Sequence, residues 1–218
     1  MYKAPGKSFL LTINISLKLF INLKLNFMKF LTKITVFFAL CILSSCQFLS
    51  SPFYDSKESV DEMIEMLNDK FTPDAGYTNI DIGHSSDLGR FLVLTAAKDI
   101  NSNKLERWRF TTRDGWEQLS DITMEIDGDF PPAEFMFQLK DVPVEKMADI
   151  ALAAVEKVKS EKDIDEVVCT GFSFWLKSRN HENKMEDLGM QTSIEPANGG
   201  TKFRCELNQA GEIVDMRY

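Results

Sequence analysis

Residues 104–126 read KLERWRFTTRDGWEQLSDITMEI, and this stretch decides the fold class. Its two arms, residues 104–112 and 116–126, alternate apolar with polar side chains, a period of two that is typical of a half-buried β-strand. Between the arms, the tripeptide RDG has the composition of a tight turn. The stretch therefore predicts a β-hairpin with one face packed against a core.

Six further runs with this alternation occur elsewhere in the chain. The last two are separated by a glycine-containing turn, so they predict a second hairpin at the end of the chain. Short turns join antiparallel neighbours, and the runs together therefore predict antiparallel sheet. Their limits are 77–82, 90–96, 166–176, 190–195, 201–208 and 212–218.

Two segments have the apolar spacing of an amphipathic helix. The first begins at Ser59, where Ser59 and Glu62 have the spacing of a capping box, and it continues to Phe71. The second starts near Pro143, which a first helical turn tolerates, and it ends near Ser160. The predicted inward stripes are Val60, Met63, Ile64, Leu67 and Phe71 in the first helix, and Met147, Ile150, Ala151, Ala154, Val155 and Val158 in the second.

A helix followed by antiparallel strands occurs twice, so the predicted fold class is α+β, with two sequential units of one helix packed on an antiparallel sheet. We place the two units at residues 56–130 and 131–218. This order resembles the small helix-on-sheet domains called cystatin-like or PepSY-like, and tandem pairs such as the β-lactamase inhibitory proteins. The resemblance implies a fold and carries no activity with it.

Charge is distributed unevenly along the chain. Residues 1–54 contain six Lys and no acidic side chain, whereas residues 55–218 contain 19 Lys and Arg against 33 Asp and Glu, a net charge of −14. Nucleic acid must be met by clustered cations, so this acidic body is not expected to bind it. The change in charge also separates the first 54 residues from the folded body.

Residues 28–46, MKFLTKITVFFALCILSSC, have a charged start, a short apolar run and small residues before a cysteine. This is the pattern of a secretory signal peptide, and the apolar run is too short to span a bilayer. The last four residues, LSSC, resemble the lipobox of bacterial lipoprotein precursors. The resemblance implies removal of residues 28–45, attachment of a diacylglycerol to the thiol of Cys46, and acylation of the new amino end.

The segments around this signal complete the predicted precursor. Residues 1–27 are interpreted as a spurious upstream extension, and residues 46–55 as a lipidated tether. In lipoproteins of enteric bacteria, an aspartate directly after the cysteine resembles an inner-membrane retention signal, and here that position is Gln47. We therefore expect a protein of the bacterial cell envelope, held at the membrane by its lipid anchor, with the outer membrane favoured over the inner membrane.

The two cysteines of the body, Cys169 and Cys205, are predicted to stay unpaired. Strand alternation turns Cys169 outward, away from the side that carries Phe172 and Phe174, and turns Cys205 inward. Opposite faces and an intervening strand exceed the separation of about 7 Å over which a disulfide joins two Cα atoms.

Few other residues suit catalysis or metal binding. Histidine occurs only as His84, in the turn-like sequence HSSD, and as His181, without a second ligand at a metal-like spacing. The acidic run at residues 125–129 lacks the spacing of a calcium loop, and no glycine-rich phosphate loop occurs. We predict no catalytic residue, no metal site and no cofactor.

Four cations and one tryptophan are predicted to share the side of the sheet that carries no helix. Alternation turns them away from the apolar residues that pack under the helices. Because Arg and Trp often dominate binding surfaces, this side is a candidate for contact with a partner. The alternative is a solvated sheet face whose charges serve solubility. The candidate binding residues are Arg107, Arg109, Trp175, Lys202 and Arg204.

These patterns predict an exported, lipid-anchored, non-enzymatic binding or protein-interaction module, whose partner is a protein segment or an acidic ligand. Two alternatives stay open. One is an envelope hydrolase or lyase with a carboxylate-based site, which would need a deep pocket and a buried acid. The other is a passive structural or assembly component of the envelope.

Overall fold

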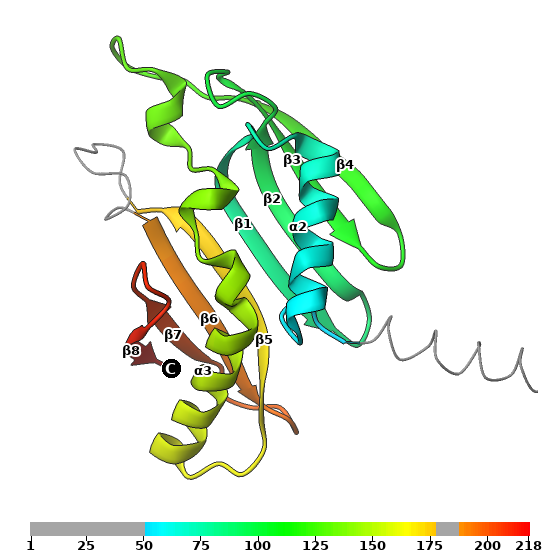
Figure 1. Cartoon of the computed structure of the whole chain (residues 1–218), viewed down its shortest axis with the longest axis vertical. Helices are drawn as coiled ribbons and strands as arrows, with labels where there is room; N and C mark the ends of the chain where they lie inside the picture. Colours follow the sequence, from blue (N-terminus) through cyan, green and yellow to red (C-terminus); the bar gives the residue numbers. More distant parts are fainter. Residues whose placement is uncertain (1–50, 178–187) are drawn as a thin grey trace, which may run out of the picture. The chain divides into compact units, whose positions relative to one another are not determined.

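The computed structural model describes residues 51–177 and 188–218. Within these residues the chain is α+β, with one antiparallel sheet of eight strands, two α-helices and three short 3-10 helices (Figure 1). The helices are α2 (Lys57–Phe71), η1 (Pro132–Phe135), η2 (Leu139–Asp141), η3 (Val144–Lys146) and α3 (Met147–Lys162). The strands are β1 (Gly76–Ser85), β2 (Gly89–Ala97), β3 (Lys104–Thr111), β4 (Gly115–Thr123), β5 (Val167–Leu176), β6 (Leu188–Pro196), β7 (Phe203–Leu207) and β8 (Ile213–Arg217).

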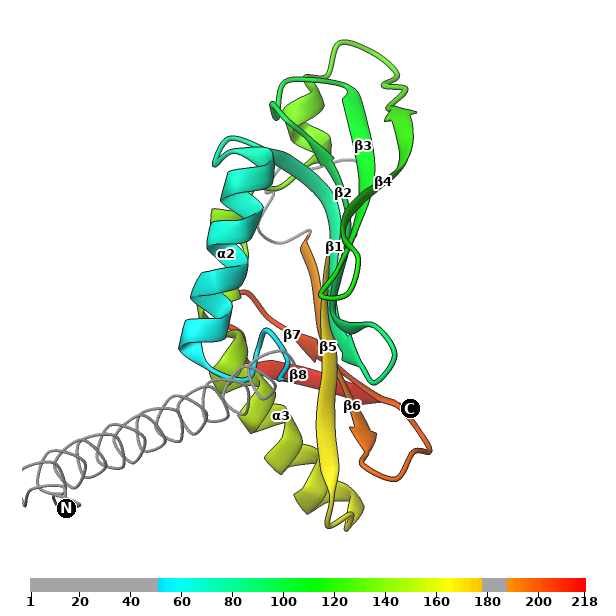
Figure 2. The same ribbon diagram turned by 90° about the vertical axis from the view of Figure 1, so that its right-hand side faces the viewer.

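The strands lie in the order β4-β3-β2-β1-β5-β6-β7-β8, and all neighbours are antiparallel. Strands β1 and β5 meet in the centre, so the strands of the two predicted units form one continuous sheet. Helices α2 and α3 lie on the same side of it (Figure 2). We call that side the covered face and the opposite side the open face.

Helix α2 begins earlier than the sequence predicts. Its N-cap is Ser56, whose side-chain oxygen accepts a hydrogen bond from the backbone N–H of Ser59 at 3.2 Å. The predicted capping box is therefore wrong, because Ser59 lies inside the helix. The predicted apolar stripe is confirmed, with Ile64 partly buried and the other four residues, Val60, Met63, Leu67 and Phe71, fully buried.

Helix α3 follows η3 and buries the expected stripe, with Val155 only partly covered. The helix ends at Asp163, which has a left-handed φ of 55°, and Lys159 and Lys162 place positive charge beside its last carbonyls. Among the described residues, no helix has the length and apolar content needed to cross a membrane.

The predicted faces of the third strand in each half are confirmed. In β3, Trp108 and Phe110 lie on the covered face, where the ring of Trp108 meets Phe71 of α2 with the ring centroids 6.1 Å apart. In β7, Phe203 and Cys205 are buried with residues of α3. The arginines that alternate with these residues therefore lie on the open face.

Cys169 is an exception to the predicted alternation. A bulge between Cys169 and Gly171 shifts the pairing of β5 with β6, and the Sγ of Cys169 lies 3.3 Å from Oγ1 of the buried Thr192. The prediction that Cys169 points outward is wrong, because an extra residue inverts the alternation on one side of the bulge. Cys169 and Cys205 are both free thiols, and β6 lies between their strands.

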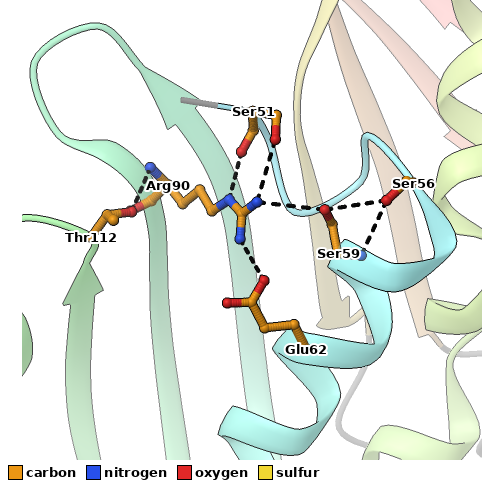
Figure 3. Close-up of polar contacts among 6 residues, drawn as sticks. All are labelled: Ser51, Ser56, Ser59, Glu62, Arg90 and Thr112. Atoms are coloured by element: carbon orange, nitrogen blue, oxygen red, sulfur yellow. Dashed lines mark hydrogen bonds and ion pairs between the residues drawn. The ribbon is translucent and has the colours of Figure 1, made fainter. Parts of the chain in front are cut away.

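The folded body begins before the predicted end of the tether. Phe53 and Tyr54 are only 2% and 3% exposed, and the Tyr54 hydroxyl donates a hydrogen bond to the backbone carbonyl of Cys169 at 3.2 Å. Arg90, at the start of β2, holds this segment, since its Nε donates to the backbone carbonyl of Ser51 at 2.5 Å (Figure 3). Residues 51–55 therefore belong to the body.

The Arg90 guanidinium also binds helix α2, although the side chain is almost fully buried. Its Nη1 pairs with Oε2 of Glu62 at 2.8 Å, and its Nη2 donates to the Ser59 hydroxyl at 3.5 Å (Figure 3). Its Cζ lies 5.0 Å from the centre of the Phe53 ring. A buried charge is tolerated when it is paired and hydrogen-bonded. Arg90 thus joins β2, α2 and the first described residues.

Candidate binding site on the open sheet face

The structure places the predicted cations on the open face in two separate groups. Arg107 and Arg109 project from β3, whereas Arg204 projects from β7 with Lys202 just before that strand. The strand order separates β3 from β7 by five steps, roughly 24 Å at about 4.8 Å per step. Trp175 lies on β5, nearer to Arg204. The predicted residues therefore do not form one basic patch.

Two of the four cations are neutralised by neighbouring carboxylates. Arg109 pairs with Glu117 at 2.5 Å, and Lys202 pairs with Glu195 at 3.0 Å. Within residues 51–177 and 188–218, the other two cations form no ion pair and remain available to a ligand. They are the exposed side chains of Arg107 and Arg204.

Arg204 and Trp175 line the same open hollow, which has a volume of about 330 Å³. The hollow is also lined by Asp81, Ser173 and Gln191, which stand in register on β1, β5 and β6, with Asp81 on the far side of β5 from Arg204. With Asn79, the hollow thus combines two of the five predicted residues with four polar residues that the sequence pattern did not single out.

Trp175 forms one wall of the hollow because its neighbour on β6 is a glycine. A Cβ at Gly189 would lie 2.2 Å from the indole ring, so only a residue without a side chain lets the ring lie over the strand. The indole N–H has no acceptor among the described residues. Trp175 is only half-buried, so this donor is open to a ligand.

Asp81 supplies a carboxylate that its neighbours hold in place. The Ser173 hydroxyl donates to Oδ1 of Asp81 at 2.7 Å, and Nδ2 of Asn79 donates to Oδ2 at 3.5 Å. Side chains fixed by hydrogen bonds lose less conformational entropy when a ligand binds. The polar floor of the hollow is therefore partly preorganised.

A larger cleft of about 900 Å³ lies beyond Trp175 on the open face and continues to the loop after β4. It is lined by apolar side chains such as Leu105, Ile122 and the exposed Phe130, and also by the carboxylates of Glu125 and Asp127. A concave site with two acids is thus present, outside the set of predicted binding residues.

The described residues contain little else that suits catalysis. His84 is half-buried near the end of β1, where it pairs with Arg90 of β2. Of the predicted turn HSSD, only Ser86 and Asp87 lie in the turn into β2, and His181 lies outside the described residues. Within the described ranges, no group of His, Cys, Asp and Glu is placed to hold a metal ion.

The two body thiols are poor nucleophiles at neutral pH. Burial raises the pKa of Cys169 to about 11 and raises the pKa of Cys205 above its usual range. The thiolate is the reactive form, so both groups are unreactive near pH 7.

No family model, curated protein or solved structure matches this chain.

Proposed function

We propose that this chain is an exported, lipid-anchored, non-enzymatic binding module of the bacterial cell envelope, with its ligand held on the open face. One observation carries the binding role: Arg204 and Trp175 line the same hollow, and no described residue forms an ion pair with Arg204 or accepts a hydrogen bond from the Trp175 indole N–H. Arg and Trp side chains that their own protein leaves unsatisfied are the groups that binding surfaces use most.

The proposed anchor is the thiol of Cys46. Its support is the signal pattern of residues 28–46 and the absence of acidic side chains before Asp55. Each buried methylene contributes about 0.8 kcal/mol to membrane binding, so two or three acyl chains hold a protein far more firmly than one. The protein would be tethered to the membrane, with the outer membrane favoured.

The anchor is tested by replacing Cys46 with Ser in the full-length chain. We expect loss of metabolic labelling with a palmitate analogue and transfer of the protein from the detergent phase to the aqueous phase. Cys169→Ser is the matched control, because it removes a body thiol and should keep both properties. An unmodified Cys46 in the mass spectrum of the natural protein would refute the anchor.

The finer architecture is also part of the proposal. We regard residues 56–130 and 131–218 as two helix-on-sheet units of one kind, each with a helix before a four-stranded meander. In support, the two segments have the same order of elements, and β3 and β7 each bury aromatic or apolar residues on one side of an exposed arginine. Cystatin-like and PepSY-like domains have this order of elements.

The binding role is tested by capture of envelope partners with the detergent-solubilised, full-length protein. We expect Arg204→Ala and Trp175→Ala to weaken capture and to leave the circular dichroism spectrum unchanged. Arg113→Ala is the matched control, since it removes the same charge from the turn between β3 and β4, outside the hollow. If both hollow variants capture the same partners as the natural protein, the hollow is not the binding site.

One observation favours a second candidate, an envelope hydrolase or lyase: Glu125 and Asp127 both line the larger cleft, although both are exposed and neither is the buried acid that this candidate needs. Incubation with purified envelope polymers, followed by mass spectrometry of released fragments, tests it. An enzyme would release fragments, and the isosteric pair Glu125→Gln and Asp127→Asn would abolish that release. No release by the natural protein would leave binding as the function.

A further inference from the structure

The hollow between Trp175 and Arg204 contains fixed groups of both charges. Arg204 is a cation and Asp81 is an anion, and no ion pair joins them. Opposite charges that stay apart in one site can each bind a different part of a ligand. A ligand for this hollow must therefore satisfy a hydrogen-bond acceptor and a set of donors at once.

Charge argues against a strongly anionic ligand. The body has a net charge of −14, which repels anions during approach, and the Asp81 carboxylate would face an anion inside the hollow. A cationic ligand would be repelled by the positive charge of Arg204 inside the hollow. A neutral ligand that is rich in hydroxyl or amide groups avoids both penalties, because such groups donate to Asp81 and accept from Arg204.

Trp175 adds an apolar, flat surface to these polar groups. The indole lies over Gly189, and the ring lines the hollow beside the side chains of Ser173 and Gln191. An indole combines a large apolar face with one polar N–H. A pyranose sugar whose substituents are all equatorial has the matching form, with flat C–H faces and a rim of hydroxyl groups.

We propose that the hollow binds neutral pyranose units of a glycan, with all ring substituents equatorial, and that this is the ligand class of the binding function proposed above. Trp175 stacks on a C–H face of the ring. Asp81, held by Ser173 and Asn79, accepts hydrogen bonds from ring hydroxyls, while Arg204 donates to hydroxyl or acetamido oxygens. A volume of about 330 Å³ is at the small end of ligand pockets, which suits a short stretch of sugar units.

The test uses the full-length protein in a detergent without a sugar headgroup. The probes are β1,4-linked tetramers of glucose and of N-acetylglucosamine, measured by titration calorimetry and saturation-transfer NMR. We expect at least one tetramer to bind, and each of Trp175→Ala and Arg204→Ala to weaken it about tenfold, equivalent to about 1.4 kcal/mol. Binding should change little with salt, because the ligand is neutral.

Two control variants match the two hollow variants. Arg113→Ala removes an exposed arginine from the turn between β3 and β4, and Phe91→Ala removes the aromatic ring that lies over a glycine, Gly83, on the open face. Both should keep the affinity of the natural protein. Trp175→Phe keeps an aromatic face and should retain more affinity than Trp175→Ala, which guards against a loss caused by unfolding.

The outcomes separate the ligand class from the binding role. If neither tetramer binds, or if both hollow variants bind them normally, the glycan proposal is wrong. If an acidic peptide binds instead, in a salt-dependent way that Arg204→Ala removes, the glycan proposal fails while the binding function stands. If the hollow variants change neither glycan binding nor partner capture, both proposals fail.

Discussion

The covered and open faces of the sheet use arginine in opposite ways. Arg90 on the covered face is 4% exposed and binds Glu62, Ser59 and the backbone of Ser51. Arg204 on the open face is exposed and forms no ion pair with any described residue. Both lie on strands of the same sheet, so residue type alone does not separate an arginine that its own protein holds from one that it leaves exposed. Burial and partners make that distinction.

The largest expected effect follows from replacing the buried arginine. Arg90→Ala leaves the Ser51 carbonyl without its arginine donor, leaves the Ser59 hydroxyl with only the Ser56 hydroxyl as donor, and opens a cavity beside Phe53. We expect the free energy of unfolding to fall by about 3 kcal/mol, less than for a fully buried pair because Glu62 is half exposed. Chemical denaturation at neutral pH measures it.

The matched variant is Arg204→Ala, which should change stability by no more than about 0.5 kcal/mol. Hydrogen exchange adds a local measurement, because residues 51–55 should lose protection in Arg90→Ala and keep it in Arg204→Ala. Equal losses of stability in the two variants would contradict the distinction between the faces.

The open face also depends on missing side chains, and glycine variants measure this. A Cβ at Gly171 would lie 2.5 Å from the backbone oxygen of Ile82, in the centre of the sheet, whereas a Cβ at Gly189 would meet the ring of Trp175. A ring at the surface can rotate away, but a paired strand cannot. We expect the free energy of unfolding to fall by about 2 kcal/mol in Gly171→Ala and by about 1 kcal/mol in Gly189→Ala, measured by thermal unfolding.

Gly189→Ala has a second expected effect, since the displaced ring of Trp175 would no longer wall the hollow. Partner capture should fall in Gly189→Ala and persist in Gly171→Ala, provided that the latter is assayed below its unfolding temperature. The reverse result would mean that Trp175 is not part of the binding surface.

Alternation was sufficient to predict most of the sheet and both helix stripes. In β3, for example, Trp108 and Phe110 can be buried only if Arg107 and Arg109 face the other way, and the structure has this arrangement. The period of the pattern therefore predicts the faces of a strand that has no inserted residue; the register shift between Arg107 and Trp108 comes from an extra residue, Leu119, on β4.

Features that depend on contacts between distant residues were not predicted. The bulge next to Cys169 inverts the alternation, and one inserted residue leaves no mark in composition. Ser59 and Glu62 match a capping box by spacing. In the structure both side chains of helix α2 instead bind the buried Arg90 of strand β2. Alternation did indicate that Arg90 is buried, because it shares its face with Leu92 and Leu94. It did not indicate which residues Arg90 would bind.

The hollow shows the same limit. Trp175 and Arg204 were selected from alternation on their own strands, whereas Asp81 belongs to the other half of the chain and reaches them only because β1 pairs with β5. That central pairing is between strands far apart in the sequence, so no local pattern encodes it.

The covered face should also determine how stability depends on pH. Burial raises the pKa of Cys169 to about 11 in the folded state, while the unfolded thiol ionises near 9. The folded state therefore holds the thiol proton more tightly than the unfolded state does. The contribution of this proton to the free energy of unfolding is complete below pH 9 and is lost as the pH rises towards 11.

Cys169→Ser removes this titration and isolates its effect. Between pH 8 and pH 10, the natural protein should lose about 1 kcal/mol more stability than Cys169→Ser. Denaturation at a series of pH values measures the difference. Parallel curves for the two proteins would show that the thiol is not desolvated in the folded state.

The smallest expected effect concerns the exposed pair Arg109–Glu117, in which the two side chains are 44% and 54% exposed. Water screens such a pair and its side chains lose entropy when they meet, so a double-mutant cycle with alanine should give a coupling energy of no more than about 0.5 kcal/mol.

The same cycle on Arg90 and Glu62 should give a larger coupling, because the arginine side chain of that pair is only 5% exposed. High salt should remove the first coupling and leave most of the second. If both couplings were equally small, Arg90 would be held by Ser51, Ser59 and Phe53 and not by its ion pair, and the two faces would then differ in hydrogen bonding and packing alone.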